Sequence, residues 1–269
     1  RGTYINAFHE ITEIPYGEKL YGFPSTQQKI VNIVDSQTIQ LYLGEDEEPF
    51  HLFHGKVLSY ERVLHLNKGY VERKIHWRSP KGIEVKLRFT RLVSFVRREL
   101  FAQRLEIEPV NFFGEIKIVS TVNGDVSNYV NDNDPRVAQG HAKLLKVVHS
   151  GTHNGYSVVE CMAERSQLHT ACITSHRLPG AKETTNVTET AVETVFETKL
   201  TNPLTFEKLN IYVDTLRHGN SLIEKGMDLQ VDLREVTYEN LLGEQTSYVQ
   251  SFWSHADIVI HGDDKVQEG

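Results

Sequence analysis

A two-residue alternation of apolar and polar side chains constrains the fold of this chain more than any other feature. The segment RSPKGIEVKLRFTRLVSF, residues 78–95, opens with a turn and then alternates. One phase holds Ile83, Val85, Leu87, Phe89, Val93 and Phe95. Successive side chains of a β-strand point to opposite faces, so this phase predicts a strand with one buried face. Arg91 interrupts the apolar phase.

Arg91 has a companion on the preceding strand. Pro80-Lys81-Gly82 predicts a three-residue hairpin loop with its glycine in the left-handed conformation. In the register that this loop sets, Arg73 lies opposite Phe89 and Arg91 lies opposite Val71. A guanidinium in an apolar layer costs several kcal/mol unless it is paired and hydrogen-bonded. We therefore assign Arg73 and Arg91 structural roles in preference to ligand binding.

The same alternation recurs along most of the chain. Residues 56–122 predict a meander of antiparallel strands, with Asn67-Lys68-Gly69 as a second hairpin turn. Further strands are predicted near Leu144 and at 156–162, 168–175, 187–200 and 205–215. Repeated strands with turn residues between them are typical of a large sandwich. The sequence thus predicts an all-β protein, with a large antiparallel super-β-sandwich over residues 1–235.

The period changes near the end of the chain. Apolar and aromatic side chains recur there at three- and four-residue spacings, at Tyr238, Leu241, Leu242, Gln245, Tyr248, Val249, Phe252 and Trp253. This spacing predicts a C-terminal amphipathic helix over residues 237–255. The following ADIVIHGDD predicts a short strand and turn. We treat 236–269 as a helical segment and short strand distinct from the sandwich.

Composition excludes several classes of function. The chain carries 29 Lys and Arg against 36 Asp and Glu, a formal charge of −7, which argues against nucleic-acid and anionic-membrane partners. No apolar run approaches the roughly 20 residues of a membrane helix. Two cysteines, Cys161 and Cys172, are too few for a disulfide scaffold and fit a reducing cytoplasm. RGTYINAF lacks the pattern of a signal peptide, and a start on arginine suggests a missing upstream piece.

Signals for catalysis are absent from the sequence. It contains no G-x-S-x-G elbow, no phosphate loop and no dinucleotide-binding glycine motif. The histidine pairs 51/54 and 149/153 have no third ligand at a suitable spacing, so no metal is expected. Carboxylates at 45–48, 132, 134, 263 and 264 are interpreted as solvated turn charges, because spacing alone cannot bring two of them into one pocket. We predict no catalytic residue and no cofactor.

Five segments nevertheless look familiar, and they run nearly from end to end. They are GTYINAFHE at 2–10, HGKVLSYERVLHLNKGYVERKIHWRSPKG at 54–82, RLVSF at 91–95, NGDVSN at 123–128 and FWSHADIVIHGD at 252–263. In their order and spacing the chain resembles the N-terminal domain of glycoside hydrolase family 65, the maltose, kojibiose and trehalose phosphorylases. The resemblance implies a super-β-sandwich that is followed, in the complete enzyme, by a helical linker and an (α/α)6 catalytic barrel. An N-G-Y-x-G-x-R-G type segment that opens the family pattern has no counterpart here, which puts the first strands in doubt.

The resemblance also implies a reaction. The parent activity is an inverting phosphorolysis of an α-glucosyl disaccharide, such as kojibiose, maltose or trehalose, to β-glucose 1-phosphate and glucose. Inorganic phosphate is the co-substrate, and a barrel glutamate is the general acid. No residue of this chain matches that acid, so the chain alone is expected to be non-catalytic and to serve assembly and active-site shaping. The implied partners are its own barrel and a second copy in a cytoplasmic homodimer.

Residues 124–143, GDVSNYVNDNDPRVAQGHAK, are too long and polar for an ordinary hairpin loop and are either functional or mobile. Since the family's sandwich lends a loop to the mouth of the active site, this segment is the candidate for that loop. The candidate contacts to sugar hydroxyls are Asn128, Asn131, Asp132, Asp134, Arg136 and His141. Two other functions remain open: a stand-alone carbohydrate-binding module, and an aldose-mutarotase-like enzyme that uses a histidine with a carboxylate.

Overall fold

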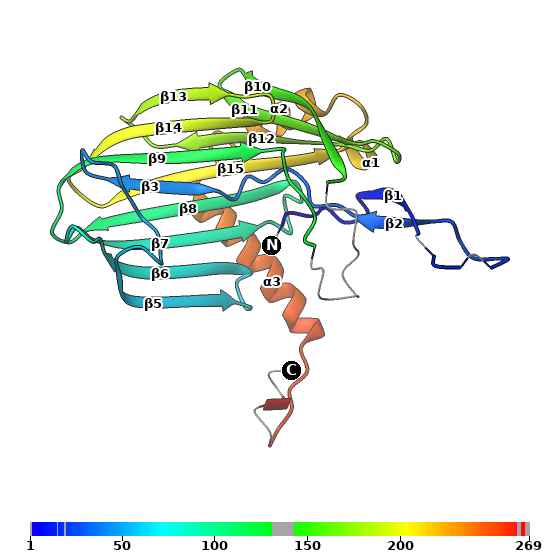
Figure 1. Cartoon of the computed structure of the whole chain (residues 1–269). Coiled ribbons are helices and arrows are strands. Elements are labelled where there is room, and N and C mark those ends of the chain that lie inside the picture. Colours follow the sequence, from blue (N-terminus) through cyan, green and yellow to red (C-terminus); the bar gives the residue numbers. More distant parts are fainter. Residues whose placement is uncertain (1, 15, 19, 131–142, 263–264, 267–269) are drawn as a thin grey trace.

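The chain folds into two stacked antiparallel sheets with helices on the outer face of one of them (Figure 1). The computed structural model describes residues 1–269 except 1, 15, 19, 131–142, 263–264 and 267–269. Among the described residues the larger sheet has eight strands in the order β10-β11-β12-β15-β8-β7-β6-β5, and the smaller has five in the order β13-β14-β9-β3-β4. The predicted all-β sandwich is confirmed.

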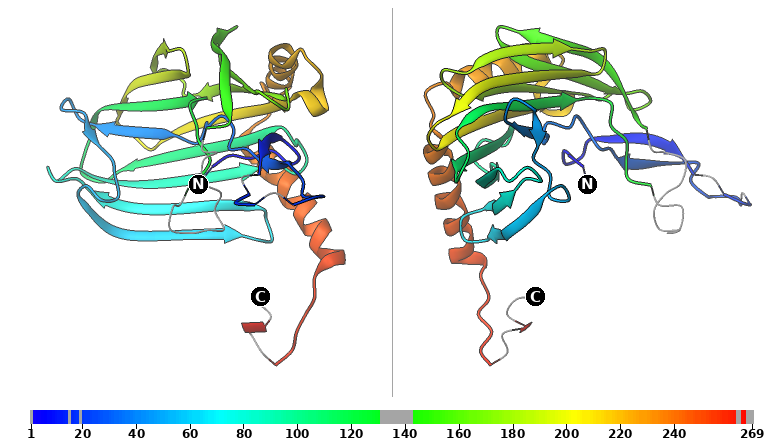
Figure 2. Two further views of the ribbon diagram at one scale, coloured as in Figure 1. Left: turned by 45° about the vertical axis from the view of Figure 1, so that its right-hand side comes forward. Right: turned by 60° about the vertical axis from the view of Figure 1, so that its left-hand side comes forward.

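The strand bounds follow the predicted alternation closely. The larger sheet contains β5 (Lys56–His65), β6 (Tyr70–Arg78), β7 (Glu84–Val93), β8 (Leu100–Pro109), β10 (Leu145–His153), β11 (Tyr156–Ala163), β12 (His169–Arg177) and β15 (Leu204–Asp214). The smaller contains β3 (Ile39–Leu43), β4 (Glu48–Pro49), β9 (Gly114–Asn123), β13 (Lys182–Val187) and β14 (Ala191–Leu200). β1 (His9–Glu13) and β2 (Thr26–Ile30) form a separate hairpin that projects from the side of the sandwich (Figure 2).

The predicted hairpin register between β6 and β7 is confirmed. Arg73 pairs with Phe89 and Val71 pairs with Arg91. Gly82 in the connecting turn has a φ of 89°, the left-handed conformation that a side chain would strain. One feature of the predicted 56–122 meander is wrong, since β9 does not continue the sheet of β5–β8 but crosses to the smaller sheet, where it pairs with β14 and β3. This crossing places the apolar faces of the two sheets against each other.

The space between the sheets holds apolar clusters separated by a polar layer. One cluster includes Trp77, Leu105 and Phe206, all fully buried. Another contains both cysteines, each buried and free. The polar layer between them holds Lys208, Asn210, Tyr212, Ser36, Gln103 and Thr174. These side chains bond to one another and to backbone carbonyls, as buried polar groups must.

Three helices cover part of the outer face of the larger sheet: α1 (Thr215–His218), α2 (Leu222–Asp232) and α3 (Tyr238–Ala256). The sequence did not predict α1 or α2. α2 packs closely on β12, because a Cβ added at Gly226 would lie 2.3 Å from Cδ1 of Ile173. The glycine lets the helix backbone approach the sheet.

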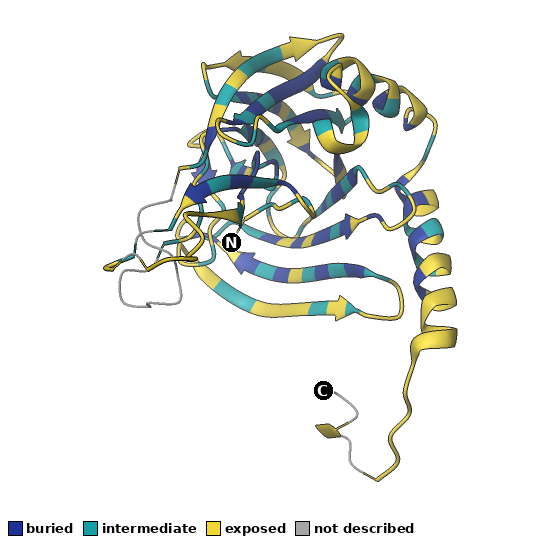
Figure 3. Ribbon diagram, turned by 90° about the vertical axis from the view of Figure 1, so that its right-hand side faces the viewer, coloured by how far each residue is buried: buried dark blue, intermediate teal, exposed yellow. Residues whose placement is uncertain are grey.

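The predicted C-terminal helix is confirmed as α3. Thr237 caps it in a capping box with Asn240. Gln245 is fully buried and holds the middle of the helix to the sheet: its Nε2 donates to the carbonyl oxygens of Gly69 and Val93, at 3.0 and 3.1 Å, and its Oε1 accepts from the backbone of Phe95 at 2.9 Å. Figure 3 shows the buried side of α3 turned toward the sandwich.

Beyond α3 the prediction of a short strand is wrong for the residues that the structure describes. Residues 257–262 are irregular and exposed and belong to none of the described sheets. The local pattern cannot show whether an alternating segment joins a sheet. Within the described residues, no helix has both the length and the apolar character that crossing a membrane requires.

Candidate functional site

The predicted substrate loop leaves the sandwich at the end of β9, and only its two ends are described. Asn128 belongs to the described part. The other predicted contacts, Asn131, Asp132, Asp134, Arg136 and His141, lie outside the described residues. The described part of the site consists of the ends of the 124–143 segment and the elements that surround them.

Asn128 anchors the first end. Its Oδ1 accepts from the backbone N–H of Asn32 at 2.7 Å, and its Nδ2 donates to the carbonyl oxygen of Ile30 at 2.9 Å. The Asn32 side chain returns a bond from Nδ2 to the carbonyl oxygen of Ser127 at 2.9 Å. These three hydrogen bonds occupy the Asn128 side-chain amide with backbone groups and fix the position of the first end of the segment.

A second pair of contacts brings the two ends together. Gly124 lies so close to β10 and β11 that an added Cβ would meet Cγ2 of Val147 at 2.7 Å and Sγ of Cys161 at 2.9 Å. Lys143 Nζ then donates to Asp125 Oδ1 at 2.5 Å. Both side chains are more than half exposed, so the pair adds little stability. It shows that the segment leaves and re-enters the sandwich at one place.

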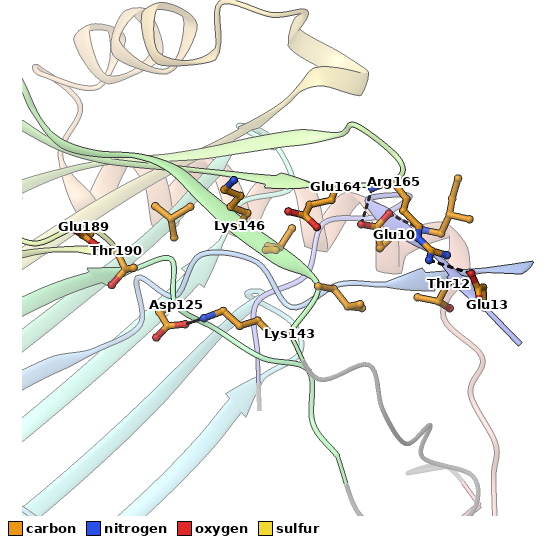
Figure 4. Close-up of a pocket in the computed structure, with 14 residues that line it drawn as sticks. Glu10, Thr12, Glu13, Asp125, Lys143, Lys146, Glu164, Arg165, Glu189 and Thr190 are labelled. Atoms are coloured by element: carbon orange, nitrogen blue, oxygen red, sulfur yellow. Dashed lines mark hydrogen bonds and ion pairs between the residues drawn. The ribbon is translucent and has the colours of Figure 1, made fainter. Parts of the chain in front are cut away.

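A polar recess of about 680 Å³ lies beside these ends (Figure 4). Its charged lining comes from β1, β10, the two ends of the 124–143 segment, the turn after β11 and the turn before β14: Glu10, Glu13, Asp125, Lys143, Lys146, Glu164, Arg165 and Glu189. Thr12 also faces it, and its hydroxyl is buried without a hydrogen-bond partner among the described residues. A hydroxyl-rich ligand would thus find cationic donors, from lysine and arginine, and anionic acceptors, from aspartate and glutamate.

The walls of the recess are held by Glu10. This carboxylate is 5% exposed and accepts from the backbone N–H groups of Ser166 at 2.8 Å and Arg165 at 3.0 Å. The Arg165 side chain binds Glu13 at 3.1 Å. Sequence reasoning missed this arrangement, because about 155 residues separate Glu10 from its partners and no local pattern links them.

The two arginines of the apolar phase lie on the inner face of the larger sheet. The guanidinium of Arg73 lies 4.5 Å from the ring centroid of Phe89, and burial lowers its pKa while a hydrogen bond to Tyr60 raises it. Arg91 Nη1 donates to Gln37 Oε1 at 3.2 Å. Both side chains are half-buried, so each guanidinium can keep contact with water. Their structural assignment stays a prediction.

Metal ligation finds no support in the described part of the chain, where no group of three or more His, Cys, Asp or Glu side chains could hold an ion. The histidine pair 149/153 brings its rings to 5.3 Å, and the pair 51/54 forms an isolated β-bridge.

Comparison with known proteins places this two-sheet sandwich in a family of carbohydrate enzymes. Residues 1–252 match the model of the N-terminal domain of glycosyl hydrolase family 65, and the chain belongs to that family. The structure is similar to a putative kojibiose phosphorylase from the human microbiome, with a TM-score of 0.81 and 19% identity, over 99% of this chain and 34% of that one. At this identity the likeness supports the fold alone.

Curated relatives narrow the comparison further. The chain is 53% identical, over its whole length, to the alpha,alpha-trehalose phosphorylase of Geobacillus stearothermophilus and 34% identical to that of Thermoanaerobacter brockii. It is 25% identical to the kojibiose phosphorylase of Halothermothrix orenii over 90% of the chain. The chain spans about a third of the length of these relatives, 35% for both trehalose phosphorylases.

Proposed function

We propose that this chain is the non-catalytic sandwich domain of a trehalose phosphorylase. The observation that supports the proposal best is the 53% identity, along the whole chain, to a trehalose phosphorylase of which it spans 35%. In the proposed reaction of the complete protein, inorganic phosphate attacks the anomeric carbon of trehalose and releases β-glucose 1-phosphate and glucose. The family match describes this chain as an N-terminal domain, and we place the chemistry in the remainder of the polypeptide.

Within that enzyme, the 124–143 segment would narrow the mouth of the active site. The support is geometric: Asn128 and the Asp125–Lys143 pair hold both ends of the segment at one edge of the sandwich. Side chains between those ends would donate hydrogen bonds to sugar hydroxyls or accept them. Asn131, Asp132, Asp134, Arg136 and His141 remain the proposed contacts, and Asn128 is proposed to position them.

The first test separates the domain from the enzyme. The 269-residue chain and the full-length protein are each incubated with trehalose and phosphate, and glucose 1-phosphate is measured. We expect release by the full-length protein alone. Turnover by the pure domain would refute a non-catalytic role. Calorimetric titration of the domain with trehalose tests the alternative of a stand-alone carbohydrate-binding module. Binding in the micromolar to millimolar range would support that alternative.

The second test addresses the loop. In the full-length protein, Asp132→Ala and Arg136→Ala are compared with Glu183→Ala, an exposed position on β13. A lost hydrogen bond to a substrate hydroxyl corresponds to about 1 kcal/mol, or roughly a fivefold rise in KM for trehalose. Unchanged KM values in both loop variants would remove the loop from the binding site.

We also propose that the complete protein is a cytoplasmic homodimer. The buried free cysteines fit a reducing compartment. Light scattering of the full-length protein on a sizing column measures its mass in solution, and a monomer mass across the micromolar range would contradict the dimer.

A further inference from the structure

The sequence contains two Asn-Gly dipeptides, Asn123-Gly124 and Asn154-Gly155. In such a dipeptide the backbone nitrogen of the glycine can attack the side-chain amide of the asparagine, because glycine has no Cβ to obstruct the approach. In an unfolded chain the two dipeptides are chemically similar. The fold makes them different, and the structure therefore decides which of the two asparagines can react.

Asn154 and Gly155 form the two-residue turn of the β10–β11 hairpin. His153 and Tyr156 are the last pair of the ladder, and the φ values of the two turn residues, 51° and 83°, are the positive values of a type I′ turn. Both turn residues are exposed, and the Gly155 N–H donates to no described residue. A Cβ added at Gly155 would meet no described heavy atom within 4 Å. The attacking nitrogen is thus accessible and uncrowded.

The Asn154 side chain is held only weakly. Its described hydrogen bond is a long one, from Nδ2 to Sδ of Met227 in α2 at 3.9 Å, and a thioether sulfur is a weak acceptor. β10 is the first strand in the order of the larger sheet and so lies at its edge. The end of a hairpin at a sheet edge opens at a small cost in free energy. Rotation that brings the Asn154 side chain to the Gly155 nitrogen therefore requires only the turn to open.

Asn123-Gly124 has the opposite environment at the end of β9. The N–H of Gly124 donates to the carbonyl oxygen of Thr190 at 2.8 Å, and Asn123 Oδ1 accepts from the backbone N–H of Asp125 at 2.9 Å. The Asn123 backbone also exchanges two hydrogen bonds with the backbone of Asp35, each of 2.8 Å. Gly124 is buried against β10 and β11. Attack at this dipeptide would first have to break these contacts, so it serves as an internal control.

We propose that Asn154 is a site of spontaneous deamidation in the folded protein and that Asn123 keeps its amide. The backbone nitrogen of Gly155 forms a bond to Cγ of Asn154, the Cγ–Nδ2 bond breaks, and ammonia leaves with the proton of the Gly155 amide. Water then opens the resulting succinimide at either of its two carbonyl groups, which gives aspartate or isoaspartate. Water is the only co-reactant. The inference does not depend on the reaction that the complete protein catalyses.

Isoaspartate at position 154 would change the hairpin and its contact with α2. It carries the main chain through the side-chain carbonyl and adds a methylene group to the backbone, so a two-residue turn can no longer keep the pairing of His153 with Tyr156. Tyr156 is 8% exposed, and its hydroxyl accepts from the guanidinium of Arg234, just after α2, at 3.3 Å. The modified turn should therefore loosen the packing of α2 on the sheet.

Peptide mapping of the aged full-length protein tests the proposal. The protein is incubated at neutral pH and sampled over several weeks, and each sample is digested under mildly acidic conditions that stop further deamidation. Mass spectrometry then measures the deamidated fraction at residues 154 and 123. We expect Asn154 to lose its amide at least about tenfold faster than Asn123, with both isoaspartate and aspartate as products. In guanidinium chloride, which removes the fold, the two rates should be similar.

Three results would overturn the proposal. They are a rate at Asn123 that equals or exceeds the rate at Asn154 in the native protein, an intact Asn154 amide after the denatured sample has reacted, and formation of aspartate without isoaspartate. The variant Asn154→Asp supplies the charge without the extra methylene group. Amide exchange in α2 should be faster in the aged wild type than in this variant, and equal exchange would contradict the effect assigned to isoaspartate.

Discussion

Lys208 gives the most specific prediction, because it is a fully buried amine in the polar layer between the sheets. Its Nζ donates to the carbonyl oxygens of Thr121 at 2.8 Å and Thr38 at 3.2 Å. Burial lowers its pKa from the ordinary 10.5 to about 7, with Arg91 acting in the same direction and Cys172 and Asp35 opposing it. At 1.36 kcal/mol per pKa unit, this fall corresponds to a penalty of about 5 kcal/mol for folding with the charged amine.

The sign of the pH effect follows from the proton count. Between pH 7 and 10.5 the unfolded chain binds a proton at Lys208 that the folded chain largely does not bind. Raising the pH across this window therefore favours the folded state. From pH 7 to 8.5, we expect this one side chain to raise the free energy of unfolding by about 1.5 kcal/mol.

The assay is urea denaturation of the 269-residue domain at steps between pH 7 and 8.5, followed by tryptophan fluorescence, to which the buried Trp77 contributes. The variant Lys208→Met keeps the length of the side chain and removes the proton. Lys68→Met, at an exposed turn position, is the control. Burial also lowers the pKa of His176. The protonation of this side chain therefore changes the free energy of unfolding mainly below pH 6.5, outside the pH window of the assay. The free energy of unfolding of the wild type, minus that of Lys208→Met, should rise by about 1.5 kcal/mol from pH 7 to 8.5. Parallel curves would refute the reasoning.

Three further predictions concern the helices and their anchors. Gly226→Ala should destabilise the domain by about 1–3 kcal/mol, because its Cβ would overlap Ile173, whereas Gly243→Ala, with open space around it, should stabilise α3 by about 1 kcal/mol. Equal melting temperatures for the two variants would contradict this. Gln245→Leu should cost at least about 2 kcal/mol in chemical denaturation, since three backbone groups lose their partner. Arg104→Leu removes ion pairs to β15 and to the first turn of α3, so amide exchange at that turn should accelerate at least about tenfold, and unchanged protection would exclude the anchor.

The fold could be predicted from the sequence wherever one face of a strand is apolar. The β6–β7 register followed from a glycine turn and from the phase of the flanking side chains, and α3 followed from its aromatic spacing. Both signals are local. The crossing of β9 to the smaller sheet left no such signal, because alternation is the same whichever sheet a strand joins.

α2 escaped prediction for a different reason. Its sequence, LIEKGMDLQVD, carries an interior glycine and charged residues that weaken the helical pattern, and it is the packing of Gly226 on β12 that explains the glycine. Tertiary contact outweighs local preference there. The strand predicted after α3 is not found in described residues 257–262, because an apolar run does not by itself show whether a segment joins a sheet.

The candidate site could be predicted only as a location. Length and polarity singled out 124–143, and the structure brings the ends of that segment beside a polar recess. The recess itself depends on Glu10 and the turn at Arg165, which meet through the tertiary fold.

The burial of both cysteines has a practical consequence for experiments on this domain. Burial raises the pKa of the Cys161 thiol to about 12 and also raises that of Cys172, so neither sulfur is a thiolate at neutral pH. Maleimide and spin-label reagents react with thiolates at accessible positions. A single cysteine introduced on the surface can therefore be labelled selectively in the native protein, with the natural pair left in place, and distances to a fluorophore or nitroxide can be measured without building a cysteine-free background.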